Sequence, residues 1–156
     1  MTLDPTVREA NVRDSIKKYF VDNLVKTEGL QVTFDKGLST PRVQGNEVDR
    51  WIAIKFGDLF MGNLSRQMLT IFCCTKKDAE GFKLAQLRDK VINYLFDSDA
   101  TDGNARITLY RSHETEAWTV IGGMVIVLEM ESNFPPTEDG TKFKTIDVTI
   151  LWGAKC

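Results

Sequence analysis

The sequence predicts an α+β fold, with an antiparallel or mixed β-sheet, two main helices packed on one face, a protruding β-hairpin and extended loops. Two segments carry apolar residues at helical spacing, and several others alternate between apolar and polar residues. Their order is helix, strand pair, helix, strand trio, which is typical of this class. With 156 residues, 42% of them hydrophobic and 27% charged, the chain is expected to form one domain over residues 1–156.

The first predicted helix runs from Pro5 to Lys26. Asp4 can accept hydrogen bonds from the free backbone N–H groups at its start, and Pro5 suits the first helical position. Gly29 is a suitable stop, because glycine readily adopts the backbone conformation that ends helices. One apolar stripe follows the helical period: Val12, Ile16, Tyr19, Phe20 and Leu24.

Strands are predicted for Leu30–Phe34, Trp51–Phe56 and Gln67–Cys74. In the second of these, Ile52, Ile54 and Phe56 share one face. The second and third strands are expected to form a long hairpin. The polar stretch Asp35–Arg50 is too long for a simple turn, and loops of this length are often functional arms or lids.

The second predicted helix begins at Thr75, which can cap it, with Asp78 three residues later in a capping-box arrangement. A polar turn over residues 97–103 ends it. The apolar stripe of this helix consists of Leu84, Leu87, Val91 and Leu95. Three strands follow, marked by Ile107 and Leu109, by Trp118–Met130 with a bulge expected at Gly122–Gly123, and by Phe143–Trp152.

Charge and cysteine usage narrow the classes of function. The net charge of −2 argues against tight duplex binding as the main task, because that needs a cationic face. Neither a secretory signal nor a membrane span of ~18 apolar residues is recognisable. The three cysteines, Cys73, Cys74 and Cys156, favour a reducing compartment. We expect one of Cys73 and Cys74 in the core and the other partly exposed, because strand neighbours face opposite ways.

The residue types that carry chemistry form no recognisable catalytic set. His113 is the one histidine and falls in a predicted polar turn, so a serine or cysteine triad would have to use it. The cysteines lack the paired spacing of a zinc site. The acidic run Asp97–Gly103 departs from the calcium-loop pattern. We therefore expect no enzyme activity, no cofactor and no metal.

Apolar residues in predicted loops are better candidates for function. A hairpin tip is normally polar, yet Leu59, Phe60 and Met61 fall between two strands, where they either meet a partner or fold back over the core. The stretch Asp35–Arg50 and the loop Glu131–Gly140 are candidate docking segments or plain surface loops. The predicted protein contacts are Leu59, Phe60, Met61, Arg42, Val43 and Phe134.

The succession of elements resembles a known family. Its segments here are Val12–Tyr19, Trp51–Phe56, Leu69–Cys73, Asp78–Leu84 and Asp139–Val148, which together span nearly the full length. In this order they resemble the tail terminator proteins of long-tailed bacteriophages, the lambda-like minor tail protein U group included. The likeness lies in patterns of elements, and no catalytic or subunit-contact residue of the family can be carried over by position.

The resemblance implies a structural role in the virion, at the head-proximal end of the tail, after synthesis in the host cytoplasm. Family members form a hexameric ring on the last ring of tail tube protein. The ring ends tube elongation and offers a surface to the head-side connector or stopper protein. DNA crosses the lumen without sequence-specific binding, and the role involves no cofactor and no membrane.

Three alternatives remain from the sequence. One is another neck or head–tail joining protein. A cytoplasmic small-molecule-binding domain or enzyme would need a deep pocket with converging polar groups. A DNA-binding regulator would need a basic face, whereas the basic residues of the second helix, such as Lys83 and Arg88, alternate with acidic ones such as Glu80 and Asp89.

Overall fold

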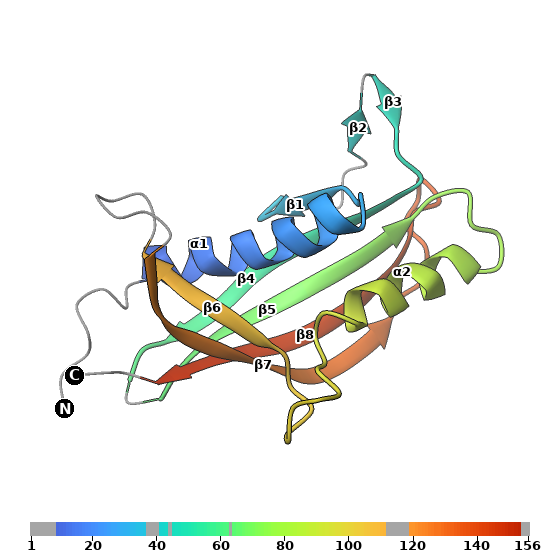
Figure 1. The fold of residues 1–156 in the computed structure, drawn as a ribbon. Helices are drawn as coiled ribbons and strands as arrows, with labels where there is room; N and C mark the ends of the chain where they lie inside the picture. Colours follow the sequence, from blue (N-terminus) through green and yellow to red (C-terminus); the bar gives the residue numbers. More distant parts are fainter. Residues whose placement is uncertain (1–8, 37–40, 44, 63, 112–118, 154–156) are drawn as a thin grey trace.

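The computed structural model describes residues 9–36, 41–43, 45–62, 64–111 and 119–153. Pro5, His113, Trp118 and Cys156, on which sequence-based expectations were placed, lie outside these ranges. The elements in chain order are α1 Glu9–Phe20, the π-helix η1 Val21–Thr27, β1 Val32–Phe34, β2 Arg42–Val43, β3 Asn46–Glu47, β4 Arg50–Phe60, β5 Leu64–Thr75, α2 Phe82–Ile92, β6 Arg106–Arg111, β7 Thr119–Asn133 and β8 Lys142–Gly153 (Figure 1).

The predicted α+β class is confirmed as a mixed sheet with two helices. The six-stranded sheet has the order β1-β4-β5-β8-β7-β6 and curls into a half-barrel (Figure 1). Its β1 strand pairs in parallel with β4, and the other neighbouring pairs are antiparallel. Within the stretch 35–50, for which the sequence predicted an extended arm or loop, β2 and β3 form a small separate hairpin.

The first helix changes its winding near its end. Its apolar residues recur every four positions, so in a regular α-helix the stripe would rotate steadily around the axis. The π-helical turn over Val21–Thr27 is wider and offsets this rotation. As a result, Leu24 is as fully buried as Ile16 and Phe20. Gly29 follows with φ +70° and donates its N–H to the Val25 carbonyl, which confirms the predicted stop.

Polar contacts fasten α1 to both margins of the half-barrel. At one margin, Arg13 pairs with Asp35 and its guanidinium lies 4.1 Å from the Phe56 ring centroid. At the other, the N–H of Tyr110 in β6 donates to Ser15 Oγ at 2.8 Å. The edge of β6 is thereby covered at this point by a side chain of α1, which removes one site for unwanted strand pairing.

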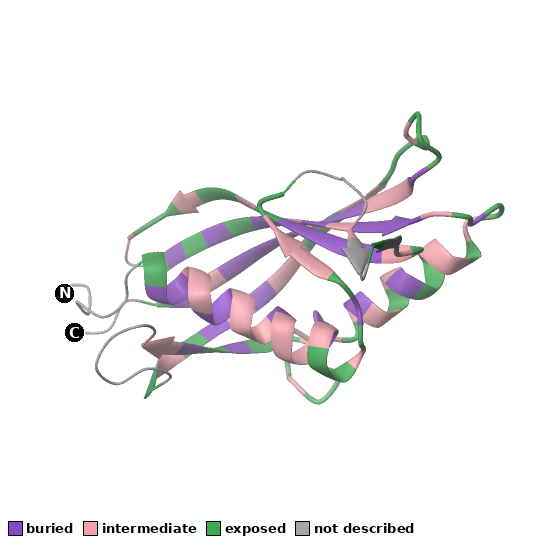
Figure 2. Cartoon of the chain, turned by 90° about the horizontal axis from the view of Figure 1, so that it is seen from above, coloured by how far each residue is buried: buried purple, intermediate pink, exposed green. Residues whose placement is uncertain are grey.

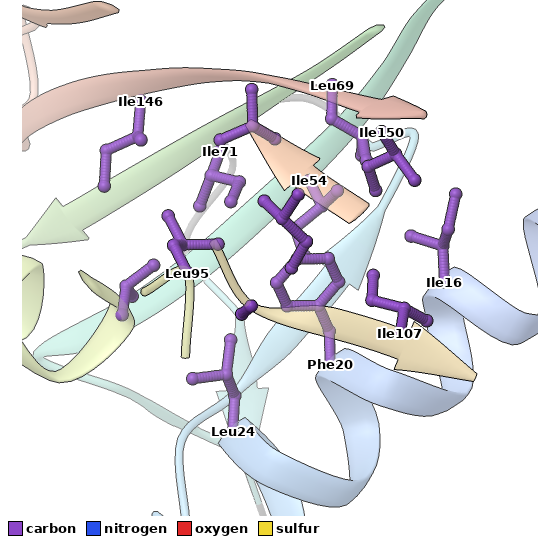
Figure 3. Close-up of a cluster of buried hydrophobic side chains, with 14 of the residues drawn as sticks. Ile16, Phe20, Leu24, Ile54, Leu69, Ile71, Leu95, Ile107, Ile146 and Ile150 are labelled. Atoms are coloured by element: carbon purple, nitrogen blue, oxygen red, sulfur yellow. The ribbon is translucent and has the colours of Figure 1, made fainter. Parts of the chain in front are cut away.

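One buried cluster unites both helices with the sheet. Its members come from α1, η1, α2 and the inner sides of the large strands, and Figure 3 shows Phe20 and Leu24 pointing toward side chains such as Ile71 and Ile107. Figure 2 shows the same pattern as buried stretches along the helices and central strands. The predicted stripes of both helices are confirmed as core positions, Tyr19 and Leu84 being partly buried.

The predicted start of the second helix was wrong. Thr75 is the last residue of β5, and α2 begins seven residues later, at Phe82. The Thr75 hydroxyl donates to Asp78 Oδ2 at 3.2 Å, a contact between side chains and not the side-chain-to-backbone pair of a capping box. Asp78, however, accepts from the N–H groups of Lys83 and Leu84 at 3.2 and 2.9 Å. It caps the helix from a distance, across a loop that the sequence pattern did not reveal.

The remaining strand predictions hold, with one correction. β4 and β5 form the long hairpin, and a register shift between β6 and β7 lies beside Gly122, where a bulge was expected. Cys73 and Cys74 are neighbours in β5, yet both are fully buried, so the expectation that one of them is partly exposed was wrong. Among the helices in the described ranges, none is long and apolar enough to cross a membrane.

Candidate protein-interaction surface

The face of the sheet opposite the core carries a groove. In β5 the core side chains are Leu69, Ile71 and Cys73, so Met68 and Thr70 belong to the opposite, outer face. A groove of about 980 Å³ lies on this face. The strands β4, β5, β7 and β8 contribute the lining side chains, chiefly Phe60, Leu64, Arg66, Met68, Thr70, Met130, Asp147, Thr149 and Leu151, with Asp58 and Glu129. We call it the sheet-face groove.

A bulge in β4 turns Phe60 into this groove. Ile52, Ile54 and Phe56 face the core, and strict alternation would place Phe60 on the same side. Between Phe56 and Leu59, however, the register with β5 shifts by one residue. The shift brings Leu59 to the inner side, against the core, and sends Phe60 to the outer face.

A buried amide stabilises this bulge. Gln67 is almost completely buried, and its Nε2 donates to the carbonyl oxygens of Gly57 and Met68, both at 2.9 Å. The Gly57 carbonyl lies in the irregular part of β4, where the regular ladder is interrupted. Because an unpaired buried carbonyl is costly, Gln67 favours the bulged conformation that exposes Phe60.

A second bulge has the same effect in β7. Leu128 packs against the core, and alternation would place Met130 there as well. A register shift between Leu128 and Met130 leaves Glu129 as the extra residue and pairs Met130 with Asp147 on the outer face. Bulges on both sides of the β5–β8 pair therefore turn a large apolar side chain from the core to the outer surface.

The exposed apolar residues of the described chain concentrate here. The exposed fractions are 55% for Phe60, 60% for Leu64, 45% for Met68 and 57% for Met130, and Met61 follows at the hairpin tip with 37%. At roughly half of the ~200 Å² that a large side chain can bury, these five amount to ~500 Å². That is the size of the largest apolar patch on a typical monomer, and such patches often mark interaction sites.

Some polar groups of the groove contact other lining side chains, and others face solvent. Thr70 donates its hydroxyl to Asp147 Oδ1 at 2.9 Å, and the Arg66 guanidinium lies 5.3 Å from the Phe60 ring centroid. Asp58 and Glu129 are exposed. The groove thus combines an apolar floor with three carboxylates and one guanidinium, an arrangement suited to an apolar partner with positive charge at its edge.

The thiols of Cys73 and Cys74 do not line the groove and are poorly reactive. Burial raises the pKa of the Cys74 thiol to about 12, and burial with the neighbouring Cys74 also raises the pKa of Cys73. Both are therefore neutral thiols near pH 7. In the described ranges, no three His, Cys, Asp or Glu side chains gather as metal ligands would.

The structure separates the six residues that the sequence singled out. Phe60 and Met61 are exposed, and Leu59 is partly buried against the core. Phe60 and Leu59 both line the groove. Phe134 is exposed after β7 and stacks on Phe143, with 5.1 Å between ring centroids. Arg42 and Val43 form β2, but their side chains lie outside the described part of the structure. Whether any of the six contacts a partner stays a prediction.

Sequence reasoning missed Leu64, Met68 and Met130. Alternation along β5 could have identified Met68, since it is out of phase with the core residues Leu69 and Ile71. Met130 carried no such signal, because the bulge that reverses its direction is visible only in the strand register. Leu64 lies at the beginning of β5, three residues before the strand that the sequence predicted from Gln67.

Comparison with known proteins shows the fold alone. No protein-family model matches the chain, and neither does any curated protein. Twelve chains of solved structures do match. One of them is 13% identical, with a TM-score of 0.53 over 93% of this chain and 95% of that one. The architecture is therefore shared over nearly the full length with a protein of very different sequence.

Proposed function

We propose that this chain is a structural assembly protein that caps the tail tube of a long-tailed bacteriophage. In this proposal several copies form a ring, most simply the hexamer that the sequence resemblance implies. The ring sits at the head-proximal end of the tail, ends tube elongation, and forms the joining surface for the head-side connector or stopper protein. DNA passes through the lumen without sequence-specific binding, and no reaction, cofactor or membrane is involved.

The sheet-face groove carries the proposal. A bulge costs ladder hydrogen bonds. The β4 bulge exchanges Phe60 for the smaller Leu59 on the core face, and the β7 bulge puts Glu131 there in place of Met130. For an isolated globule this arrangement is unfavourable, because exposed apolar area remains in contact with water. It becomes favourable when another protein chain covers the groove, as repeated docking in a ring or on a tube requires.

The finer features of the fold have a role in the same proposal. The two helices cover one face of the sheet, which leaves the opposite face for neighbouring chains. The end of the β4–β5 hairpin, with Phe60 and Met61, protrudes as a docking element, and the loops 35–50 and 131–140 dock against further subunits. Ordering of such segments on assembly would offset part of the interaction energy.

Electron microscopy of tail tubes tests this function. Purified protein is added to tail tube protein of the same phage during polymerisation, and tube ends and lengths are measured in negative stain. We expect extra density at one tube end and tubes that stop growing. Tubes of unchanged length with bare ends would contradict the proposal. Free growth of tubes, together with label on the protein between tail and head in assembled virions, would instead favour another neck or head–tail joining protein.

The volume of the groove supports a second candidate, a small-molecule-binding domain or enzyme. About 980 Å³ lies at the upper end of the range of ligand sites. Against it, the carboxylate of Asp147 already accepts from Thr70, and exposed side chains such as Phe60 and Leu64 line an open face. A metabolite screen by thermal shift tests this candidate, and saturable stabilisation that Asp147→Asn abolishes would favour it.

A further inference from the structure

A second apolar feature lies at the far end of the molecule from the groove. Phe82 is the most exposed large apolar side chain in the described ranges, with an exposed fraction of 68%. It is the first residue of α2, and its backbone is held in place because Asp78 accepts from the next two N–H groups. Leu84 packs against the core. Phe82 therefore projects from a fixed helix start.

Phe82 cannot enter the groove of its own chain. The groove lies on the outer face of the sheet, whereas α2 packs its buried residues Leu87 and Val91 against the inner face. Along β5 the groove reaches from Leu64 to Thr70, which is still five residues, about 17 Å, from the strand end where the loop to α2 begins. Figure 1 accordingly places the start of α2 and the tip of the β4–β5 hairpin at opposite ends of the molecule.

The two ends are chemically compatible. The groove presents an apolar floor with three carboxylates, from Asp58, Glu129 and Asp147, and one guanidinium. The segment before Phe82 presents exposed Lys77 and Glu80, so it carries a charge of each sign for these groups. By the same estimate, the four exposed apolar lining residues Phe60, Leu64, Met68 and Met130 offer ~400 Å², close to the apolar part of one side of a standard interface of ~800 Å² per partner.

We infer that Phe82 of one copy docks into the sheet-face groove of the next copy, so that copies associate head to tail. A projecting side chain and a receptive groove at different ends form a heterologous contact, which closes into a ring when the rotation between copies permits. The inference rests on the proposed ring and deepens it by naming the contact between subunits.

Photo-cross-linking tests the contact directly. Phe82 is replaced by p-benzoylphenylalanine, which keeps an aromatic ring there, in a mixture of ¹⁵N-labelled and unlabelled chains. We expect cross-linked peptides between copies that join position 82 to residues 60–68 or 130. The same probe at Phe96, which is also exposed, is the control and should not reach the groove. Cross-links from position 82 to the tube protein or to another region of a neighbouring copy would overturn the inference.

Complementation separates a head-to-tail contact from a face-to-face one. Phe82→Ser removes the projecting side chain and leaves the groove, and Met68→Glu does the reverse. In sedimentation at up to about 1 mM, wild type should associate, whereas each variant alone should be monomeric. An equal mixture should form a dimer, because Phe82 of the Met68→Glu chain can dock into the intact groove of the Phe82→Ser chain. A mixture that stays monomeric, or wild type that is monomeric at this concentration and shows no cross-links on tubes, overturns the contact.

These outcomes are separable from those of the proposed function. If wild type caps tail tubes but position 82 never cross-links to a neighbouring groove, the capping function stands and the contact is wrong. If the mixture of variants dimerises but wild type neither caps tubes nor changes their length, the contact stands and the function is wrong.

Discussion

Asp78 is a single side chain that sets where α2 begins. Burial by itself would raise the pKa of this carboxyl, but hydrogen bonds from the Leu84 and Lys83 N–H groups and from Thr75 hold the pKa below its ordinary value. A charged acceptor at a helix start satisfies donors that otherwise lack an intrahelical partner. The loop 76–81 can therefore connect β5 to the helix without a cap at Gly81, which makes no side-chain cap bond.

We predict that Asp78→Ala lowers the free energy of unfolding by about 1–2 kcal/mol. The reason is the loss of both acceptors for the first helical N–H groups. Urea denaturation followed by circular dichroism measures the effect. Glu80→Ala, an exposed acid in the same loop, is the matched control and should change stability by less than about 0.5 kcal/mol. Equal losses for the two variants would refute a capping role for Asp78.

Glu131 connects α2 to the sheet through a two-pronged ion pair. Arg88 donates from Nε and Nη2 to the two carboxylate oxygens at 2.7 and 2.8 Å, and Lys144 lies 3.6 Å away. The hydrogen bond from Arg88 is the main reason that the pKa of Glu131 lies below its ordinary value, against the opposing effect of burial. Such paired geometry is the strongest form of this interaction.

This ion pair predicts a pH-dependent contribution to stability. Because the folded pKa of Glu131 is below the unfolded value of ~4.3, the contribution is complete above about pH 5 and is lost as the pH falls through the folded pKa. Glu131→Gln should cost about 1 kcal/mol at pH 7 and progressively less in acid. The control is Glu129→Gln, because Glu129 lies two residues earlier in β7 and is exposed. A Glu131→Gln deficit that persists unchanged in acid would contradict this account.

At the scale of elements, periodicity identified the helices and large strands because their core faces follow it closely. Ile146, Val148, Ile150 and Trp152 alternate without interruption, and all four are buried. Irregularities were not accessible in the same way. The bulges that reverse Phe60 and Met130 depend on pairing with partner strands, and the late start of α2 depends on a carboxylate outside the helix. Each is a tertiary effect on a locally ambiguous segment.

Replacement by alanine should have opposite effects on stability at Gly123 in β7 and at Gly81, just before α2. Gly123 has ordinary strand geometry, and an added Cβ would meet no atom closer than 3.9 Å, so Gly123→Ala should leave stability unchanged or raise it by up to ~1 kcal/mol. Gly81 has φ +77°, where a side chain is strained, so Gly81→Ala should cost about 1 kcal/mol. Thermal unfolding of both variants measures this. A loss for Gly123→Ala would mean that the β7 bulge requires glycine.

At the scale of the whole molecule, the two faces of the sheet differ in composition. The inner face forms the core with both helices, whereas the outer face collects exposed apolar side chains from the β4–β5 pair and from β7 and β8, which lie far apart from that pair in sequence. Residues 60 and 130 lie on the same surface because β4 and β7 flank the β5–β8 pair. The sequence could suggest that Phe60 and Met61 are exposed, but not that Met68 and Met130 complete the same surface, since their proximity follows from strand order.

This division predicts that assembly can be removed without loss of the fold. The combined variant Phe60→Ser, Met68→Glu and Met130→Lys changes only outer-face side chains, which make little use of burial in the monomer. Its free energy of unfolding should lie within about 1 kcal/mol of wild type, while capping of tail tubes is abolished. Phe96→Ser, an exposed aromatic residue of comparable size away from the groove, should retain capping. A triple variant that still caps tubes would mean that the groove is not the docking surface, because three buried apolar contacts exchanged for polar and charged groups would be incompatible with a dry interface.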